Sequence, residues 1–170
     1  MIVIRKAGIE DAFAISAVLR QSFEEYRPQY TAEAFAVTTP EPAQMLERMK
    51  EGLVWVCELQ GRITGTVSAV PKSQGLYVRG MAVLPEARGR KMGWRLLEHV
   101  EEFAASEGLG FLFLSTTPFL DRAIRLYEHF GFHRTEQGPH DLCGTPLFTM
   151  VKPLAIAPHD QPRPAIEGEA

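Results

Sequence analysis

A short basic segment with two glycines, residues 88–93, has the residue types of an anion-binding site. It follows an apolar stretch that ends at Pro85, and it precedes a strongly periodic helical pattern. The first amides of a helix have no partner within the helix and carry partial positive charge. Three cationic side chains at such an end are unfavourable unless an anion faces them. The segment therefore predicts a phosphate or pyrophosphate site, formed by Arg88, Gly89, Arg90, Lys91 and the helical amides that follow.

This segment matches neither of the two common phosphate-binding motifs. No Gly-Lys-Ser or Gly-Lys-Thr follows, as a Walker A loop requires, and the glycine spacing of a dinucleotide fingerprint is absent. A second interpretation is that these basic residues form an ordinary solvated turn, and spacing alone leaves that open.

The hydrophobic pattern predicts the elements that would position the turn. Apolar residues at helical spacing indicate helices over 9–26, 41–50, 90–107 and 121–130, and strands are expected at 2–7, 53–59, 63–70, 76–83, 111–116, 132–136 and 145–152. Gly80, inside a strand, indicates a bulge. The strand–helix–strand segment 76–116 requires locally parallel strands, whereas the short turns elsewhere predict antiparallel hairpins. The order β-α-α-β-β-β-α-β-α-β-β therefore predicts a mixed, mostly antiparallel α/β sheet with helices on both faces.

Composition describes an ordinary globular chain of 170 residues, with 45% apolar residues, 23% charged residues and a net charge of −3. We expect one domain over 1–152 and a mobile C-terminal tail over 153–170, which holds four prolines. A net negative charge gives the chain no overall attraction to nucleic acid or to an anionic membrane surface. Cys57 and Cys143 lack the spacing of metal ligands, so we expect reduced thiols and no metal. Without a signal peptide or an apolar span, the chain is expected to be cytoplasmic.

Two segments together resemble the GNAT acyltransferase superfamily. The first is Val83-Leu84-Pro85 followed by the turn 88–93 and an amphipathic helix, which is similar to the family's acyl-coenzyme A binding motif. The second is "AIRLYEHFGF", residues 123–132, which is similar to the family's A-x-x-L-Y-E-x-x-G-F pattern. The element order fits from residue 2 to about 152. Lys91 departs from the family, which usually has a glycine there, and Leu120 stands where many members have an asparagine.

The resemblance implies a site for acetyl-coenzyme A as co-substrate. Strands 76–83 and 111–116 would separate at the bulge, and the pantetheine arm would lie between them, held like an added strand by the backbone of Met81, Ala82 and Val83. The pyrophosphate would lie near Arg88 and Arg90, on the amides of the turn and first helical residues: Gly89, Arg90, Lys91, Met92, Gly93 and Trp94.

The resemblance also implies roles in catalysis. Tyr127 would protonate the departing thiolate, although helical spacing alone would make it one more residue of the apolar face. The candidates for the base are Glu25, the pair His140 and Asp141, or a chain of water molecules. The acceptor pocket is expected to include Tyr26, Tyr30, Arg79 and His140.

The resulting interpretation is an N-acetyltransferase that uses acetyl-coenzyme A and a primary amine, carried by a small molecule or a peptide. Two alternatives stay open: a non-catalytic module that senses acyl-coenzyme A or mediates interactions, and a transferase with a longer acyl donor. A homodimer through the exposed edge of the last strands is a further expectation.

Overall fold

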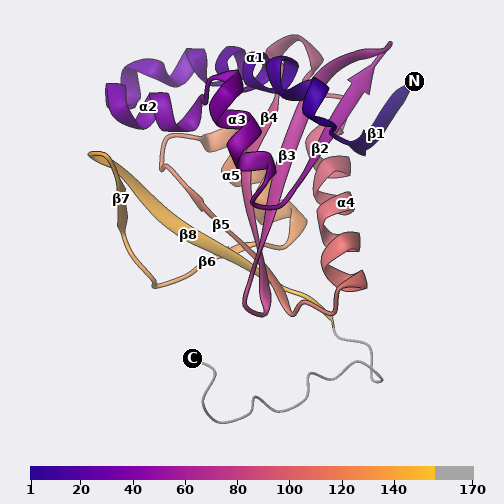
Figure 1. Cartoon of the computed structure of the whole chain (residues 1–170). Coiled ribbons are helices and arrows are strands. Elements are labelled where there is room, and N and C mark those ends of the chain that lie inside the picture. Colours follow the sequence, from indigo (N-terminus) through magenta and orange to yellow (C-terminus); the bar gives the residue numbers. More distant parts are fainter. Residues whose placement is uncertain (156–170) are drawn as a thin grey trace.

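The computed structural model describes residues 1–155, and these form one eight-stranded sheet (Figure 1). The strand order is β1-β2-β3-β4-β5-β8-β6, with β7 also paired to β8. Of the strand pairs in the described residues, β4–β5 is parallel and the others are antiparallel. The predicted mixed, mostly antiparallel sheet is confirmed. The strands are β1 (Ile2–Lys6), β2 (Leu53–Leu59), β3 (Arg62–Lys72), β4 (Gly75–Val83), β5 (Phe111–Thr116), β6 (His133–Arg134), β7 (His140–Leu142) and β8 (Thr145–Pro153).

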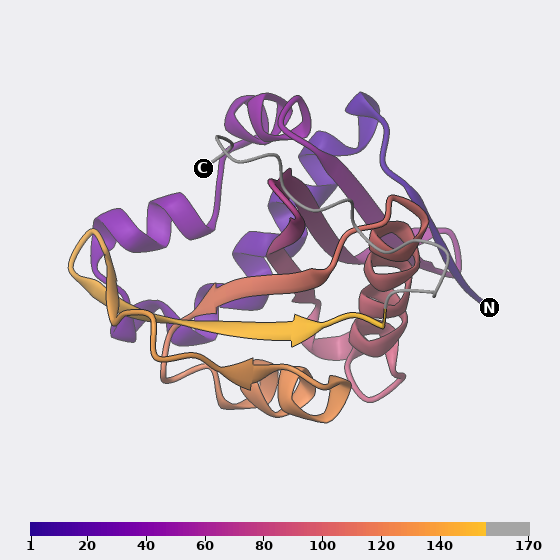
Figure 2. The same ribbon diagram turned by 90° about the horizontal axis from the view of Figure 1, so that it is seen from below.

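Helices lie on both faces of this sheet, as Figure 2 shows from below. The helices are α1 (Ala12–Phe23), α2 (Ala32–Thr38), α3 (Pro42–Met49), α4 (Met92–Ser106) and α5 (Asp121–Phe130). On one face, α1 packs against α3 and lies on β3 and β4; on the other, α4 packs on the sheet and against α5. None of the helices within residues 1–155 combines the length and the apolar character needed to cross a membrane.

The apolar face of α4 anchors the core beside the basic turn. Leu96, Leu97 and Val100 are fully buried against the sheet, as their helical spacing predicts. The helix ends before Gly108, which has a φ of 68°, a conformation that glycine adopts without steric cost. Burial of this face fixes the direction of α4, and therefore the place of its N-terminal turn relative to β4 and β5.

The region between β1 and β2 differs from the prediction. The continuous helix expected over 9–26 is α1 flanked by two 3-10 helices, Ile9–Asp11 and Glu24–Gln29. Pro28 lies within the second 3-10 helix. Its ring would disrupt an α-helix that continued through this position. Helix α2 was not predicted, because seven residues hold too little periodic signal; its N-cap Thr31 accepts a hydrogen bond from the Ala34 amide at 3.1 Å.

The end of the sheet also differs from the expectation. Strand β8 lies between β5 and β6 rather than at the edge, because β6 and the unpredicted three-residue strand β7 both pair with it. The edge on this side is β6, which has two residues and offers few backbone groups for pairing. A homodimer through this edge stays a prediction. The tail expected to be mobile lies, from residue 156 onward, outside the described residues.

One ion pair ties β1 to the start of α1. The Asp11 carboxylate is almost buried, accepts two hydrogen bonds from Arg5 at 2.8 and 3.0 Å, and accepts a third from the Gly8 amide at 2.8 Å. The Arg5 guanidinium also reaches Glu58 on β2. Hydrogen bonds from Arg5 hold the pKa of Asp11 below its usual range. Asp11 therefore stabilises the fold in its charged form.

We expect the substitution Asp11→Asn to lower the free energy of unfolding at pH 7 by about 1–3 kcal/mol, since it removes a charge-assisted acceptor from a nearly buried site. Because the pKa of Asp11 is lowered in the folded protein, this contribution is present above roughly pH 4, the pKa of aspartate in the unfolded chain. It is lost as the pH falls through the pKa of Asp11 in the folded protein. Urea titrations at pH 7 and below pH 4 measure the difference between variant and parent. The difference should shrink in acid.

A matched control is Glu47→Gln, which removes an exposed carboxylate paired with Lys50. This change should alter stability by less than about 1 kcal/mol, as exposed pairs do. An Asp11→Asn deficit that stays constant down to the lowest pH would show that the charge of Asp11 does not stabilise the fold.

Candidate active site

Strands β4 and β5 separate after a short paired segment. They pair at Gly75–Phe111, Leu76–Leu112 and Tyr77–Phe113. β4 then carries one extra residue relative to β3, between Arg79 and Ala82, and Gly80 there has a φ of 58°. This is the bulge expected at Gly80.

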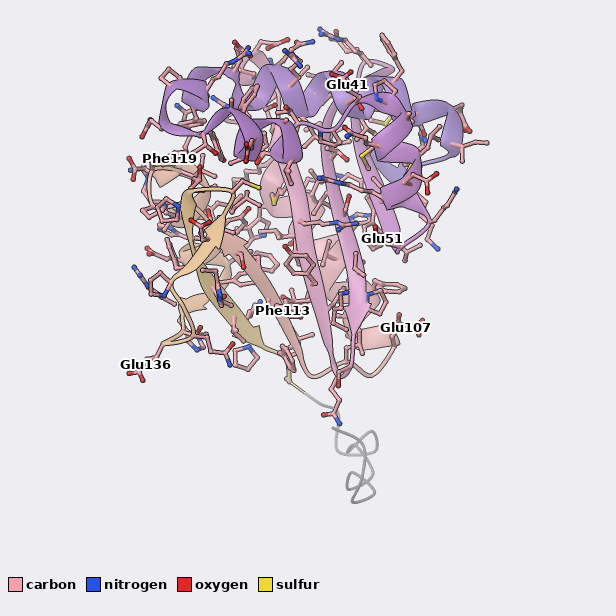
Figure 3. All side chains as sticks on the ribbon, turned by 60° about the vertical axis from the view of Figure 1, so that its left-hand side comes forward. Glu41, Glu51, Glu107, Phe113, Phe119 and Glu136 are labelled. Atoms are coloured by element: carbon pink, nitrogen blue, oxygen red, sulfur yellow. The ribbon has the colours of Figure 1, made fainter. Side chains whose placement is uncertain are left out.

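Beyond the bulge, the backbone of Met81 to Val83 has no strand partner on its β5 side. In Figure 3, Phe113 lies low in the sheet, at the last β4–β5 pair. Phe119 lies higher on the side of β8, and Glu51 lies higher on the side of β3. At this level β4 and β5 have separated. Backbone groups are therefore available to a ligand at this level of the sheet.

A cavity of about 940 Å³ occupies the region between the separated strands. It runs along β4, is bounded by the first residues of α4 and by α5, and reaches side chains of α2 and α3. Within residues 1–155, no aspartate or glutamate lines it. The charged side chains of its wall are cationic: Arg48, Arg79, Arg88, Lys91 and Arg122.

The turn before α4 forms one end of this cavity. Gly89 has a φ of 85° and open space where a β-carbon would lie. Lys91 is the N-cap of α4 and is also left-handed, with a φ of 59° and a ψ of 22°, which explains why a glycine suits this position. Gly89 and Lys91 line the cavity together with Arg88, Met92, Gly93 and Trp94, whereas Arg90 is exposed and does not line it.

Glu25 lies near this turn, held by arginines. One carboxylate oxygen accepts a hydrogen bond from Arg88 Nη1 at 2.6 Å, and the other lies 3.8 Å from Arg122 Nη2. Arg88 also donates to the Ser22 carbonyl at 3.4 Å. Glu25 itself is not part of the cavity wall. The carboxylate therefore orients Arg88 instead of facing the space where an acceptor amine would lie.

Tyr127 projects from α5 into the cavity wall. Its side chain is 8% exposed, and its ring packs edge-to-face on Phe132 at 5.7 Å. Burial raises its pKa well above the usual value, and the neighbouring Tyr30 adds to the rise. The phenol therefore stays protonated across the physiological range and is able to donate a proton or a hydrogen bond. Leu120, the N-cap residue of α5, lines the same cavity.

The acceptor-pocket candidates divide into two groups. Tyr26, Tyr30 and Arg79 all line the cavity. Burial raises the pKa of Tyr30, against the effect of the nearby Thr117 and Thr38 hydroxyl groups.

His140 and Asp141 do not line the cavity. The His140 Nε2 atom lies 3.1 Å from the Thr149 hydroxyl, and the Asp141 carboxylate accepts a hydrogen bond from the Gly144 amide at 2.9 Å. Both side chains therefore support the β7–β8 hairpin.

Arg48, Tyr77 and Thr117 are among the cavity residues that were missed in the sequence. Arg48 looks like any solvated charge at the end of a short helix, so no sequence signal was available. Tyr77 stands two positions before Arg79, and the period of two along a strand places both on one face; that signal could have been used. The Thr117 hydroxyl is buried near the Tyr30 phenol, and the hydroxyl of Ser22, another residue of the wall, is buried without a partner among residues 1–155.

The fold and this cavity define a class of protein. The model of the acetyltransferase (GNAT) family matches residues 16–132, and the chain belongs to that family. Among its relatives, the uncharacterized N-acetyltransferase YjgM of Escherichia coli (strain K12) is 30% identical over 141 residues, which cover 79% of this chain and 83% of that protein. The uncharacterized N-acetyltransferase YhfO of Bacillus subtilis (strain 168) is 30% identical over 138 residues, 76% of this chain and 88% of that protein.

A solved structure shares the fold. The PaiA N-acetyltransferase of Thermoplasma acidophilum, crystallised in complex with coenzyme A, superposes with a TM-score of 0.77 and covers 91% of this chain and 99% of its own. The two sequences are 21% identical. At that identity the likeness concerns the fold, and it agrees with the predicted α/β class.

We expect the substitution Lys91→Gly to preserve or raise the free energy of unfolding, by up to about 1 kcal/mol. The change removes the strain of a left-handed non-glycine residue, which costs the folded protein roughly 1–2 kcal/mol. It also gives the unfolded chain more conformational freedom, which lowers the free energy of unfolding by roughly 0.5–1 kcal/mol. The neighbouring change Arg90→Gly is the control, because Arg90 does not have a positive φ and only the entropic cost applies. Urea unfolding of both variants provides the comparison, and a Lys91→Gly protein less stable than Arg90→Gly contradicts the expectation.

Proposed function

We propose that this chain is an N-acetyltransferase that transfers the acetyl group of acetyl-coenzyme A to a primary amine. The observation that carries the proposal is the junction of three features in one cavity: the separated β4 and β5, the N-terminal turn of α4, and the buried phenol of Tyr127. The two bacterial relatives are named as N-acetyltransferases, which supports the reaction type. The coenzyme A complex of the Thermoplasma protein supports the donor.

The residues present fit such a donor. The unpaired backbone of Met81 to Val83 offers the pantetheine arm a strand-like partner. The open space at Gly89 and the first amides of α4 suit a pyrophosphate, with Arg88 oriented by Glu25 at the same end. In this proposal Arg90 contributes long-range charge only, because it does not line the cavity.

The donor supplies an activated thioester. The amine nitrogen bonds to the acetyl carbon while the carbon–sulfur bond breaks, and the sulfur leaves with the electron pair. Tyr127 donates a proton to that sulfur as the carbon–sulfur bond breaks, the amine loses a proton to solvent, and Tyr127 regains a proton from solvent, so an N-acetyl amine and a free thiol are formed. Burial raises the pKa of Tyr127, which keeps the phenol protonated at neutral pH so that its hydroxyl group is able to hydrogen-bond the developing thiolate.

The base of the proposed reaction is water. Glu25, the first candidate, has both oxygens near arginines, and the side chains of His140 and Asp141 are engaged at the β7–β8 hairpin. The Ser22 and Thr117 hydroxyl groups are buried in the cavity wall; within residues 1–155 that of Ser22 has no protein partner, and that of Thr117 lies near the Tyr30 phenol. They would orient water molecules that carry the amine proton away.

We expect the substitution Tyr127→Phe to lower the rate of thiol release at least ~10-fold, the lower range for loss of a general acid. Affinity for acetyl-coenzyme A, measured by titration calorimetry, should change little. The control is Tyr77→Phe, which removes another phenol of the cavity wall while its ring still stacks on Phe113 at 5.2 Å. An unchanged rate in Tyr127→Phe would remove Tyr127 from the mechanism.

Neutralising the two arginines of the turn should separate their roles. We expect Arg88→Met to weaken binding of acetyl-coenzyme A by roughly 10–100-fold, as loss of a charge-assisted hydrogen bond does. Arg90→Met should weaken it less than about fivefold, because an exposed charge acts only through screened attraction. Calorimetry on both variants tests the assignment, and equal effects would place the pyrophosphate elsewhere on the turn.

A further inference from the structure

Two arginines from separate elements line the part of the cavity that adjoins α2 and α3. Arg79 precedes the bulge of β4, and Arg48 lies in the last turn of α3. Arg79 lies four positions before Val83, at the phosphate end of β4, which is at most roughly 13 Å along an extended strand. These two arginines therefore lie away from the turn that suits a pyrophosphate, and a different anionic group is needed to explain them.

Arg79 lines the cavity and has one donor without a partner. One terminal nitrogen of its guanidinium bonds the Glu51 carboxylate, which lies beside β3 in Figure 3. Its Nε atom is enclosed by protein and has no hydrogen-bond partner within the described residues. A buried donor without a partner destabilises the folded protein. A small movement of the Arg79 side chain toward an anionic ligand would give this donor an acceptor.

Arg48 has a charge without a carboxylate partner. It donates to the backbone carbonyl of Val37 on α2, and none of the ion pairs within residues 1–155 includes it. Burial and the positive charge of Arg79 hold its pKa below the usual value, and Glu51 opposes part of this effect. An anion placed between the two guanidinium groups would offset the repulsion between them and the cost of burying the Arg48 charge.

The remaining wall at this end is largely apolar and aromatic, and Thr38 of α2 adds a hydroxyl group. Val37, Tyr26, Tyr77 and Leu142 contribute to it, and no acidic side chain of the described residues does. A polyamine would place further positive charge beside two arginines with no carboxylate in the cavity wall to receive it. A ligand with one carboxylate and an apolar body meets opposite charge and matching surface.

We propose that Arg48 and Arg79 bind a carboxylate group of the acceptor, so that the acceptors of this protein are amino acids with apolar or aromatic side chains. The proposal rests on the acetyl transfer proposed above and adds the class of acceptor. A guanidinium presents donors in the geometry of a carboxylate, and both arginines line the cavity. The amine of the same molecule is left free to approach the thioester.

The test is thiol release from acetyl-coenzyme A by matched acceptors. Each set holds an amino acid, its amide and its decarboxylated amine, for example phenylalanine, phenylalaninamide and phenethylamine; spermidine is added as a polyamine. We expect kcat/KM for the amino acid to exceed that for its two relatives by at least ~10-fold, as loss of a charge-assisted contact predicts. Equal values within the sets, or a preference for spermidine, overturn the proposal.

Variants then identify the residues. Arg48→Gln and Arg79→Gln should each lower kcat/KM for the amino acid by about 10–100-fold, chiefly through KM, and should leave kcat/KM for the amide within about threefold. The control is Arg62→Gln on β3, an exposed arginine outside the cavity that pairs with Glu86; it should change neither value. Equal losses for amino acid and amide would mean that the two arginines only support the fold.

The two proposals fail in different ways. Calorimetry of the unaltered protein with acetyl-coenzyme A reports the donor site independently of any acceptor. If the protein binds acetyl-coenzyme A and acetylates amines without preferring those that carry a carboxylate, the proposed acceptor class is wrong and the proposed acetyl transfer stands. Absence of binding overturns the proposed function itself. Binding without transfer to any amino acid also counts against Arg48 and Arg79 as carboxylate ligands.

Discussion

The separation of β4 from β5 after their third residue pair is the constraint on which the rest of the structure depends. A closed sheet would satisfy the backbone of Met81 to Val83 with strand partners. Here a bulge at Gly80 turns β4 away, and the crossover through α4 holds the two strands at their paired ends. The opening between them becomes a cavity that keeps polar backbone groups available, and the family's chemistry requires such a place for a donor.

Charge is distributed around this opening with a consistent sign. Cationic side chains line the cavity, while the carboxylates near it, Glu25 and Glu51, stand outside the wall and hold arginines in position. At the α4 end, arginine, glycine and helix amides suit phosphate groups. At the α3 end, arginines with apolar neighbours suit a carboxylate on a less charged molecule. In our proposals one cavity thus takes an anionic group at each end, and Tyr127 also contributes to its wall.

Much of this could be predicted from the sequence. The apolar face of α4, the glycine-bearing turn before it and the bulge at Gly80 each depend on local backbone and burial preferences, which short stretches encode. Helix α2 and strand β7 were missed because they are too short for a periodic pattern. Glu25 was a candidate base implied by the family resemblance; the ion pair of its carboxylate with Arg88 had no sequence signal, because side-chain partners depend on how distant elements pack.

The sequence by itself determined the class of fold, the basic, glycine-bearing character of residues 88–93 and the presence of a tyrosine on α5, since these are properties of local pattern. Only the tertiary structure decided which charges meet. Arg48 and Arg79 are 31 positions apart and share a cavity wall because α3 packs against α1, which lies on β3 and β4. Such a pairing has no local signal, because it arises from the packing of whole elements through their buried faces.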